Sequence, residues 1–264
     1  EAVDDLFAAE RFDAVVNLAA QVGVRYSVEN PYAYVQSNVL GFLNILEACR
    51  HNPVKHLVFA SSSSVYGLNE EVPYNEDDKA DTPVSLYAAT KKADELMAHS
   101  YAKLYGIPMT GLRFFTVYGP WGRPDMAPML FANAITRGEP IKIFNNGDLI
   151  RDFTYVDDIV EGTVRTLDRP SMASECANGV PFRIFNIGCS QPVNLMDFIS
   201  ELEKAFGKEA QKVFLPMQQG DVYRTNADTS KLEDQVGYKP CMRLRDGIGA
   251  FVKWYLSDKN PLRI

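Results

Sequence analysis

Short apolar runs alternate with longer segments of helical periodicity along most of the chain, and this alternation constrains the fold more than any other feature. Residues 13–20 (DAVVNLAA) form a continuous apolar run, as expected for a strand that is buried on both faces of a sheet. We expect further strands at residues 55–61, 109–116, 141–144 and 183–187, and helices at residues 31–50, 86–105, 128–137, 156–166, 195–206 and 245–254. This order of strands and helices is typical of an α/β protein with a doubly wound parallel sheet.

Charge and composition argue against several classes of function. The 264 residues carry a formal net charge of −7 without a Lys/Arg cluster, so we expect no nucleic-acid partner. No apolar run approaches the ~20 residues of a membrane span, so we also expect no membrane association. The four cysteines lack the spacing of metal ligands, which predicts no metal site and reduced thiols in a cytoplasmic protein. Because the chain begins at Glu1 without Met, we expect it to be part of a longer protein.

Polar side chains follow the second expected strand. Ser61, Ser62, Ser63 and Ser64 stand at its carboxyl end, where open parallel sheets place their ligand crevice. Four serines on their own more often form a polar turn. Whether these serines form part of a reactive site therefore depends on which side chains the next helix places at the same edge of the sheet.

The helix expected at residues 86–105 carries Tyr87 and Lys91 near its start. Residues four apart lie on the same face of a helix, so the ammonium can sit beside the phenol. A nearby cation favours the phenolate and lowers a pKa that starts at about 10. A phenol that accepts a proton at neutral pH is what alcohol oxidation by hydride transfer requires. This spacing is common by chance, but its position one loop after the serines favours a reactive site.

A loop at residues 116–127 gathers Trp, Arg and Pro after the third long strand. Loops of this composition often line a ligand pocket. The alternative is that Trp121 packs against the protein and Arg123 is merely solvated.

Several ordered motifs resemble those of the extended short-chain dehydrogenase/reductase family. The stretches that carry the resemblance are LAAQVGVRYSVENP (18–31), ASSSSVYG (60–67), SLYAATKKADELMAHSYAKLYG (85–106) and LRFFTVYGPWGRPDM (112–126). It extends over essentially the whole chain through RDFTYVDDIVEG (151–162), FNIG (185–188), GDV (220–222) and ADTSKL (227–232). Within that family the sequence is most similar to the UDP-glucuronate 4-epimerases.

The resemblance implies a role for each matching residue. It implies Tyr87 as the acid/base, Lys91 as its electrostatic partner and a contact of the nicotinamide ribose of NAD, and Ser62 as the partner of the reacting sugar hydroxyl. The other implied cofactor contacts are Leu18, Ala19, Ala20, Gln21, Ser37 and Phe115. The implied contacts of the UDP-sugar substrate are Ser63, Ser64, Thr116, Arg123, Arg151 and Asp221.

One departure from the family concerns the NAD site. The glycine-rich turn after the family's first strand, and the acidic residue about 20 positions later, should lie upstream of Glu1. We therefore expect a Rossmann-like parallel sheet that lacks its first βαβ units, and weak NAD binding by this chain. Residues 1–118 and about 150–190 are assigned to this partial NAD-binding domain, and about 119–149 and 191–264 to a smaller C-terminal substrate-binding subdomain.

The resemblance also implies a reaction, epimerisation at C4 of a UDP-sugar through a 4-keto intermediate. The family's dehydratases carry an Asp–Glu pair where this chain has Ser63 and Ser64, which cannot protonate a leaving hydroxyl, and its decarboxylases usually carry Glu near this position. Conversion of UDP-glucuronate to UDP-galacturonate is favoured because Arg123 can grip a carboxylate by a two-pronged contact. A UDP-glucose/UDP-galactose 4-epimerase and a non-catalytic nucleotide-sugar-binding protein are the alternatives.

A homodimer is the expected assembly. The helix at residues 86–105 carries a wide apolar stripe, formed by Ala93, Leu96, Met97, Tyr101 and Leu104. The resemblance implies that this helix and residues 31–50 pack against their counterparts in a second copy as a four-helix bundle.

Overall fold

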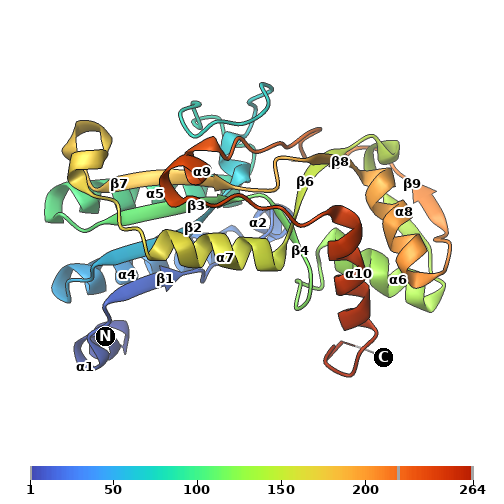
Figure 1. Ribbon diagram of the computed structural model, residues 1–264, viewed down its shortest axis with the longest axis horizontal. Helices are drawn as coiled ribbons and strands as arrows, with labels where there is room; N and C mark the ends of the chain where they lie inside the picture. Colours follow the sequence, from blue (N-terminus) through green and yellow to red (C-terminus); the bar gives the residue numbers. More distant parts are fainter. Residues whose placement is uncertain (1, 219–220, 263–264) are drawn as a thin grey trace.

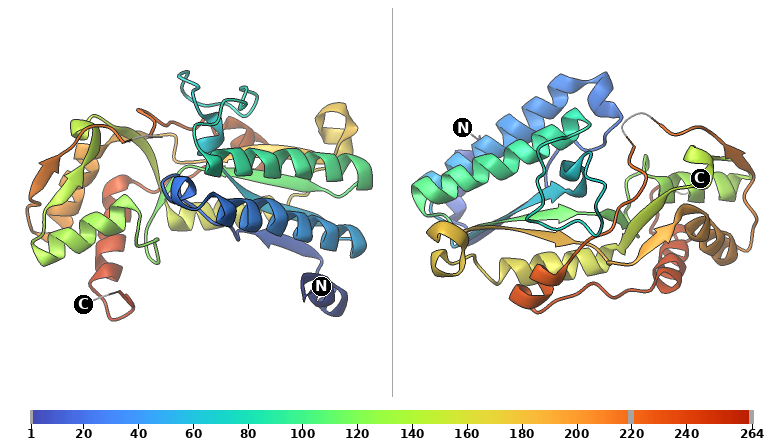
Figure 2. Two further views of the ribbon diagram at one scale, coloured as in Figure 1. Left: turned by 180° about the vertical axis from the view of Figure 1, so that it is seen from behind. Right: turned by 90° about the horizontal axis from the view of Figure 1, so that it is seen from above.

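Four parallel strands form the centre of the larger lobe. In the computed structural model, which describes residues 2–218 and 221–262, the strands are β1 (Ala14–Asn17), β2 (His56–Ser62), β3 (Met109–Phe114) and β7 (Phe182–Ile187), in the order β1-β2-β3-β7. The helices α4 (Gly41–His51) and α5 (Leu86–Tyr105) cover one face, and α7 (Val156–Leu167) and α9 (Ser230–Val236) cover the other (Figures 1 and 2). Helices on both faces confirm the predicted α/β, doubly wound architecture. Gly220 of the GDV motif lies outside the described residues.

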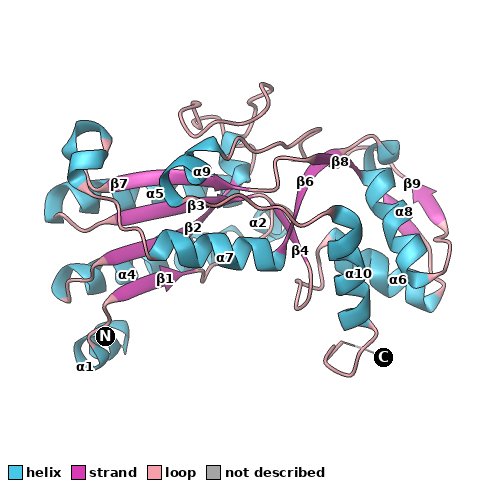
Figure 3. Ribbon diagram, in the orientation of Figure 1, coloured by secondary structure: helices cyan, strands magenta, loops and turns pink. Residues whose placement is uncertain are grey.

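A smaller lobe lies beside this sheet (Figure 3). Its strands are β4 (Thr116–Tyr118), β6 (Ile150–Tyr155) and β8 (Pro192–Asn194) in one sheet, and β5 (Ile141–Ile143) and β9 (Lys212–Phe214) in another. Its helices are α6 (Ala127–Arg137), α8 (Leu195–Phe206) and α10 (Leu244–Tyr255). Aliphatic and aromatic side chains fill its core, and the rings of Phe153 and Phe198 stack with centroids 4.1 Å apart.

The remaining helical segments are short and lie mostly in connections. They are α1 (Ala2–Glu10), α2 (Tyr26–Glu29), α3 (Pro31–Tyr34), the π-helix η1 (Val35–Leu40) and the 3₁₀ turns η2 (Ser63–Tyr66), η3 (Phe144–Gly147), η4 (Ala173–Glu175) and η5 (Ala177–Gly179). Five of the observed elements were not expected from the sequence pattern: η1, α9, β6, β8 and β9. The single helix expected at residues 31–50 is divided into α3, η1 and α4.

Local capping fixes both ends of α5, the helix that carries Tyr87. The Ser85 hydroxyl accepts a hydrogen bond from the amide of Ala88 at 3.1 Å, which satisfies one free N–H of the first turn. Gly106 ends the helix with a φ of 68°, a left-handed conformation that glycine adopts without a steric penalty. The structure confirms the predicted bounds 86–105. They could be predicted because both capping signals are local.

The strand β1 differs from its expected environment. Among the described residues it pairs only with β2, so it forms an edge of the sheet. Val16 remains 38% exposed, and Leu18, just past the strand, remains 55% exposed. Burial of β1 on both faces is therefore not observed, whereas its place at the edge agrees with the expected sheet that lacks its first βαβ units.

The strand predicted at residues 109–116 splits at Phe115. The residues before it pair with β7 in the large sheet, whereas Thr116 pairs with Phe153 in the smaller lobe. The chain thus passes from one lobe to the other directly beyond the carboxyl end of β3. This crossing brings the two lobes together at the edge where the serines lie.

Candidate active site

The serine cluster ends β2 and begins the turn η2. Ser62 is 8% exposed and its hydroxyl accepts a hydrogen bond from the amide of Ser64 at 3.2 Å, which caps the turn. Ser63 and Ser64 are half-buried within the turn. Gly67 follows with a φ of 54°, and a Cβ at this position would lie 1.9 Å from the carbonyl oxygen of Thr82. Only glycine therefore allows the chain to pass so close to the segment that leads into α5.

Tyr87 lies in the first turn of α5, next to this serine cluster. Its ring contacts the ring of Tyr34 edge-to-face, with centroids 6.2 Å apart. The Tyr34 hydroxyl donates to the carbonyl oxygens of Val22 at 3.0 Å and Gly23 at 2.6 Å, in the loop after β1. Tyr34 therefore links the reactive helix to the loop that the resemblance assigns to the cofactor.

Lys91 lies one helical turn beyond Tyr87 and is buried, with 4% exposure. Its ammonium donates to the carbonyl oxygen of Ala60 at 2.9 Å and to Asp94 Oδ2 at 3.2 Å. The first contact anchors Lys91 to β2, two residues before Ser62. A lysine ammonium has three donors, so one N–H remains available for a ligand.

The pKa of Tyr87 is raised rather than lowered, in contrast to the expectation from the sequence. Burial is the largest cause, since it disfavours the charged phenolate. The nearby Ser62 hydroxyl and the charge of Arg123 act in the opposite direction, and the charges of Tyr34 and Asp94 raise the pKa further. The predicted effect of Lys91 is absent from these main causes.

The loop after β1 is held in place by Asn38, a residue that the sequence analysis missed. Asn38 is buried in the π-helix η1, where its side chain accepts from the amide of Gln21 at 2.8 Å and donates to the Gln21 carbonyl at 3.0 Å. It also donates to the Thr90 hydroxyl of α5 at 2.9 Å. Ser37, the predicted contact, is exposed on the outside of η1. A π-helix shifts the register of the faces, which apolar periodicity in the sequence does not reveal.

The residues predicted to contact the cofactor are otherwise spread over two environments. Leu18 and Ala19 are exposed and Ala20 and Gln21 are half-buried, all beyond the carboxyl end of β1. Phe115 is buried in a cluster with Tyr74 beneath the segment that follows η2. The structure therefore brings Tyr87, Lys91 and Ser62 together, whereas the ring of Phe115 lies within the core.

Arg123 reaches the site from the loop between β4 and α6. Its guanidinium pairs with Asp125 through two contacts, Nε to Oδ1 at 3.0 Å and Nη2 to Oδ2 at 2.5 Å. Burial raises the pKa of both Tyr87 and Tyr34, and the charge of Arg123 opposes this rise. A Cβ on Gly23 would lie 3.1 Å from Arg123 Nη2. Arg123 thus lies where the small lobe meets the loop after β1.

Arg151 and Asp221 form a second charged pair. Arg151 Nη2 donates to Asp221 Oδ1 at 3.2 Å, and Nη1 donates to the carbonyl oxygens of Ile150 and Tyr223, each at 3.0 Å. Burial lowers the pKa of Arg151, although the charge of Asp221 counteracts this effect. The two residues, predicted separately, are brought into contact by β6 and the segment after β9. Thr116 begins β4 between the two lobes and is half-buried.

A buried ion pair supports the serine end of β2 from below. Arg113 on β3 donates to both carboxylate oxygens of Glu95 on α5, at 2.8 and 2.9 Å, and the Ser61 hydroxyl donates to the same carboxylate at 2.7 Å. Burial alone would raise the pKa of Glu95, but these hydrogen bonds and the Arg113 charge hold it below its usual value. The pair fixes β2, β3 and α5 relative to one another.

The residues present fit one half of an NAD molecule. Lys91 offers a free donor at the carboxyl end of β2, next to Tyr87 and the loop after β1. In that loop Gly23 stands alone, and among the described residues no glycine-rich turn connects a strand to the helix that it opens. The donor set therefore suits the nicotinamide half and not the pyrophosphate half.

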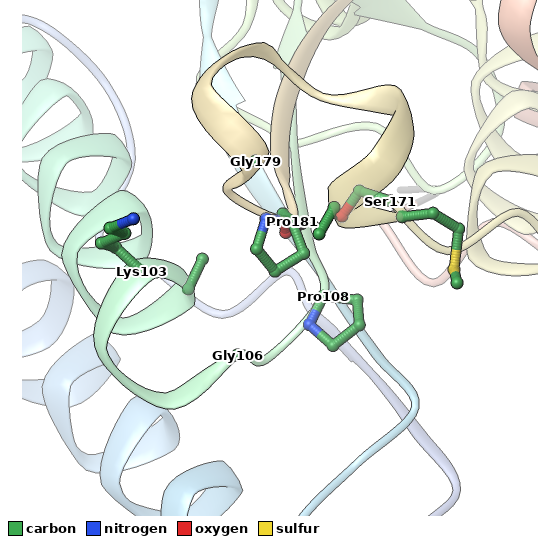
Figure 4. Close-up of a pocket in the computed structure, with 9 residues that line it drawn as sticks. Lys103, Gly106, Pro108, Ser171, Gly179 and Pro181 are labelled. Atoms are coloured by element: carbon green, nitrogen blue, oxygen red, sulfur yellow. Dashed lines mark hydrogen bonds between the residues drawn. The ribbon is translucent and has the colours of Figure 1, made fainter.

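Other features of the molecule lie apart from this site. A cavity of about 320 Å³ is lined by Lys103, Pro108, Ser171 and Pro181, among others (Figure 4). Pro108 and Pro181 precede β3 and β7, so the cavity lies at the amino ends of the strands, opposite to Ser62.

The described helices include none that is long and apolar enough to cross a membrane. The described residues also contain no group of three or more His, Cys, Asp or Glu side chains placed to bind a metal ion.

Comparison with known families matches residues 1–188 to the family described as NAD dependent epimerase/dehydratase. The chain belongs to this NAD-dependent family. Similar proteins include a probable UDP-glucuronate 4-epimerase of Rhizobium meliloti, 52% identical over 95% of this chain and 76% of the relative. UDP-glucuronate 4-epimerase 1 of Arabidopsis thaliana is 49% identical, over 96% of this chain and 61% of the relative. The chain therefore spans about three fifths to three quarters of these two relatives.

Solved structures agree with the family. The UDP-glucuronic acid 4-epimerase from Bacillus cereus, in complex with UDP-glucuronic acid and NAD, superposes with a TM-score of 0.87 at 36% identity, covering 96% of this chain and 78% of that chain. The UDP-glucose 4-epimerase from Thermotoga maritima has a TM-score of 0.85 at 28% identity, covering 96% and 80%. This likeness confirms the fold class predicted from the sequence.

Proposed function

We propose that the protein is an NAD-dependent epimerase that converts UDP-glucuronate to UDP-galacturonate through a 4-keto intermediate. The observation that carries the proposal is the convergence of Tyr87, Ser62 and Lys91 at the carboxyl end of β2, within a family whose similar members at about 50% identity bear this activity in their names. Arg123 supports a sugar with a carboxylate, because its guanidinium already holds the Asp125 carboxylate by a two-pronged contact that a sugar carboxylate can replace.

The chain's own groups suit the proton transfers of this reaction. Ser62 orients the C4 hydroxyl of the sugar, and the Tyr87 phenolate accepts its proton. NAD, when bound, supplies the acceptor and later the donor of the C4 hydrogen. The 4-keto sugar then turns within the site, and the Tyr87 phenol returns its proton to the C4 oxygen of the opposite epimer. Lys91 holds the nicotinamide ribose and favours the phenolate when the ligand draws its ammonium towards Tyr87.

The remaining residues bind the two ends of the substrate. Arg151 and Asp221 hold the phosphates and ribose of UDP, and Ser63, Ser64 and Thr116 line the sugar pocket with Arg123. Leu18, Ala19, Ala20, Gln21, Ser37 and Phe115 belong to the cofactor side in this proposal. We assign NAD binding to the larger lobe and substrate binding to the smaller lobe. Compared with the division expected from the sequence, β4 and β6 then belong to the smaller lobe and α9 to the larger one. With four free cysteines, the protein suits the cytoplasm.

A direct assay tests the reaction and the sugar. UDP-glucuronate that carries deuterium at C4 is supplied with NAD, and the products are separated and weighed by mass spectrometry. We expect UDP-galacturonate that retains the deuterium, because the hydrogen removed from C4 returns to C4. Faster conversion of UDP-glucose to UDP-galactose would overturn the choice of sugar, and loss of the deuterium to water would overturn the mechanism.

We also propose that two copies associate through α5 and the segment α3–η1–α4. Leu96 and Leu104 on α5 are 60% and 70% exposed, and Leu40 on η1 is 48% exposed. Tyr101 is already bonded to Glu47, which joins the two helices of one copy into a single face. Sedimentation at micromolar concentration should show a dimer, and a Leu96→Glu, Leu104→Glu variant should be monomeric. A monomeric wild-type protein would contradict the proposal.

A further inference from the structure

Two adjacent carboxylates on α5 are equally buried but are compensated differently. Glu95 is 3% exposed and bonds to Arg113, Ser61 and Lys92. Asp94 is 2% exposed, and Lys91 is its only hydrogen-bond partner among the described residues. Its Oδ1 is buried and has no hydrogen-bond partner among the residues that the structure describes. A buried carboxylate oxygen that is left unpaired is unfavourable, so the presence of Asp94 calls for an explanation other than stability.

Lys91 connects Asp94 to the reacting groups. Its ammonium lies between the Ala60 carbonyl at 2.9 Å and Asp94 Oδ2 at 3.2 Å, so Asp94 fixes its position from the side of the helix. Without Asp94, a single backbone contact would hold this long, flexible side chain. The pairing also means that the positive charge beside the site is balanced whenever Asp94 is ionised.

The charge of Asp94 also reaches Tyr87, whose pKa it raises. Burial raises the pKa of Asp94 itself to about 7, although Lys91 counteracts this effect. The charged and titratable groups around the two residues are Lys91 and Glu95 on α5, Arg113 on β3, Tyr34 on α3 and Arg123 from the loop before α6. Glu95 and Arg113 are paired with each other, and Arg123 is paired with Asp125.

We propose that Asp94 is a positioning residue that holds Lys91 against β2 and whose charge tunes the acidity of Tyr87. The proposal rests on the proposed function, because it takes Tyr87 as the acid/base of the reaction. While Asp94 is charged and paired with Lys91, its charge favours the protonated form of Tyr87. A ligand that draws the Lys91 ammonium from Asp94 towards Tyr87 favours the phenolate. Loss of this charge makes Tyr87 a stronger acid.

Substitution of Asp94 by Asn separates charge from shape. The amide oxygen can still accept a hydrogen bond from Lys91, whereas the negative charge is gone. Asp94 lies seven residues after Tyr87, or about 10 Å along a helix that rises 1.5 Å per residue. At that distance one charge changes a pKa by about half a unit to one unit when the effective dielectric constant is about 20–40. We therefore expect the pKa of Tyr87 to fall by about this amount in Asp94→Asn.

The pKa is measured by NMR on ligand-free protein that carries a carbon label at tyrosine Cζ. Comparison with Tyr87→Phe identifies the Tyr87 signal among those of the 13 tyrosines. Asp94→Ala gives a second neutral side chain in case one variant does not fold. Glu139→Gln, which removes an exposed charge after α6, is the matched control and should leave the signal unchanged. A Tyr87 pKa that is unchanged or higher in the folded Asp94 variant would overturn the proposal.

This titration requires no turnover, so its result is independent of the identity of the substrate. A second readout uses the enzyme with NAD and UDP-glucuronate, where the acidic limb of the profile of kcat/KM against pH should move to lower pH in Asp94→Asn. A purely structural role would lower kcat/KM equally at every pH, and that result would also overturn the proposal. If Tyr87→Phe keeps full activity while Asp94→Asn shifts the Tyr87 pKa, the proposed function fails and the tuning by Asp94 stands.

Discussion

The two strands that carry the candidate site are neighbours in one sheet but lie in opposite environments. Six of the seven residues of β2 are buried, and the strand is flanked by β1 and β3. By contrast, β1 forms an edge, and none of its four residues is buried. The reacting groups depend on β2, through Ser62 and the Lys91–Ala60 contact, whereas the loop assigned to the cofactor continues from β1. The chemistry is thus built on the more enclosed of these two strands, and side chains hold the cofactor loop.

Asn38 and Tyr34 hold the loop after β1 in place. Three hydrogen bonds of Asn38 and two of the Tyr34 hydroxyl fasten residues 21–23 to η1, α3 and α5. The site therefore has two parts. The reacting groups are held by the sheet, and the cofactor loop is held by side-chain hydrogen bonds.

The largest effect on stability is expected at the buried support of β2. Glu95→Gln leaves the Arg113 guanidinium buried without its charged partner, which should lower the free energy of unfolding by about 3–5 kcal/mol. Glu161→Gln breaks an exposed i,i+4 pair with Arg165 and is the matched control, with an expected loss of less than about 1 kcal/mol. Urea unfolding measures both. Equal losses would show that the Glu95–Arg113 pair does not support the site.

A smaller effect is expected from a pair of valines that tests the comparison directly. Val16 on β1 and Val58 on β2 are register partners, but Val58 is fully buried whereas Val16 is 38% exposed. Val58→Ala should lower the free energy of unfolding by about 2–3 kcal/mol, because it leaves a cavity in the core. Val16→Ala should cost less than about 1 kcal/mol, because its site is open to water. Similar losses in the two variants would mean that β1 is covered in solution.

Features of the fold that depend on local signals could be predicted from the sequence. The bounds of α5 are an example, since Ser85 and Gly106 cap it through contacts within a few residues. The burial of β1 could not be predicted, because an apolar run shows that a strand can be buried and not which neighbours it has. Likewise, β6, β8 and β9 are strands of three to six residues that pair with segments far away in the sequence.

The site shows the same division. The positions of Tyr87, Lys91 and Ser62 follow from helix spacing and from the end of β2, and the structure brings them together. The direction of the Tyr87 pKa shift could not be predicted, because burial, its largest cause, depends on tertiary packing. The Arg123–Asp125 pair and the hydrogen bonds of Asn38 to Gln21 depend on side-chain orientation, which residue spacing does not specify.

The removal of the Tyr87 hydroxyl tests the central claim most directly. Tyr87→Phe deletes one oxygen from a ring that packs against Tyr34, so the folded state should persist, as checked by thermal unfolding. With saturating NAD and UDP-glucuronate, we expect epimerisation to fall by about 10²–10⁴-fold, the usual contribution of a general acid/base. Tyr105→Phe, at the exposed end of the same helix, should keep full activity. Retention of more than about a tenth of wild-type activity by folded Tyr87→Phe would contradict the account.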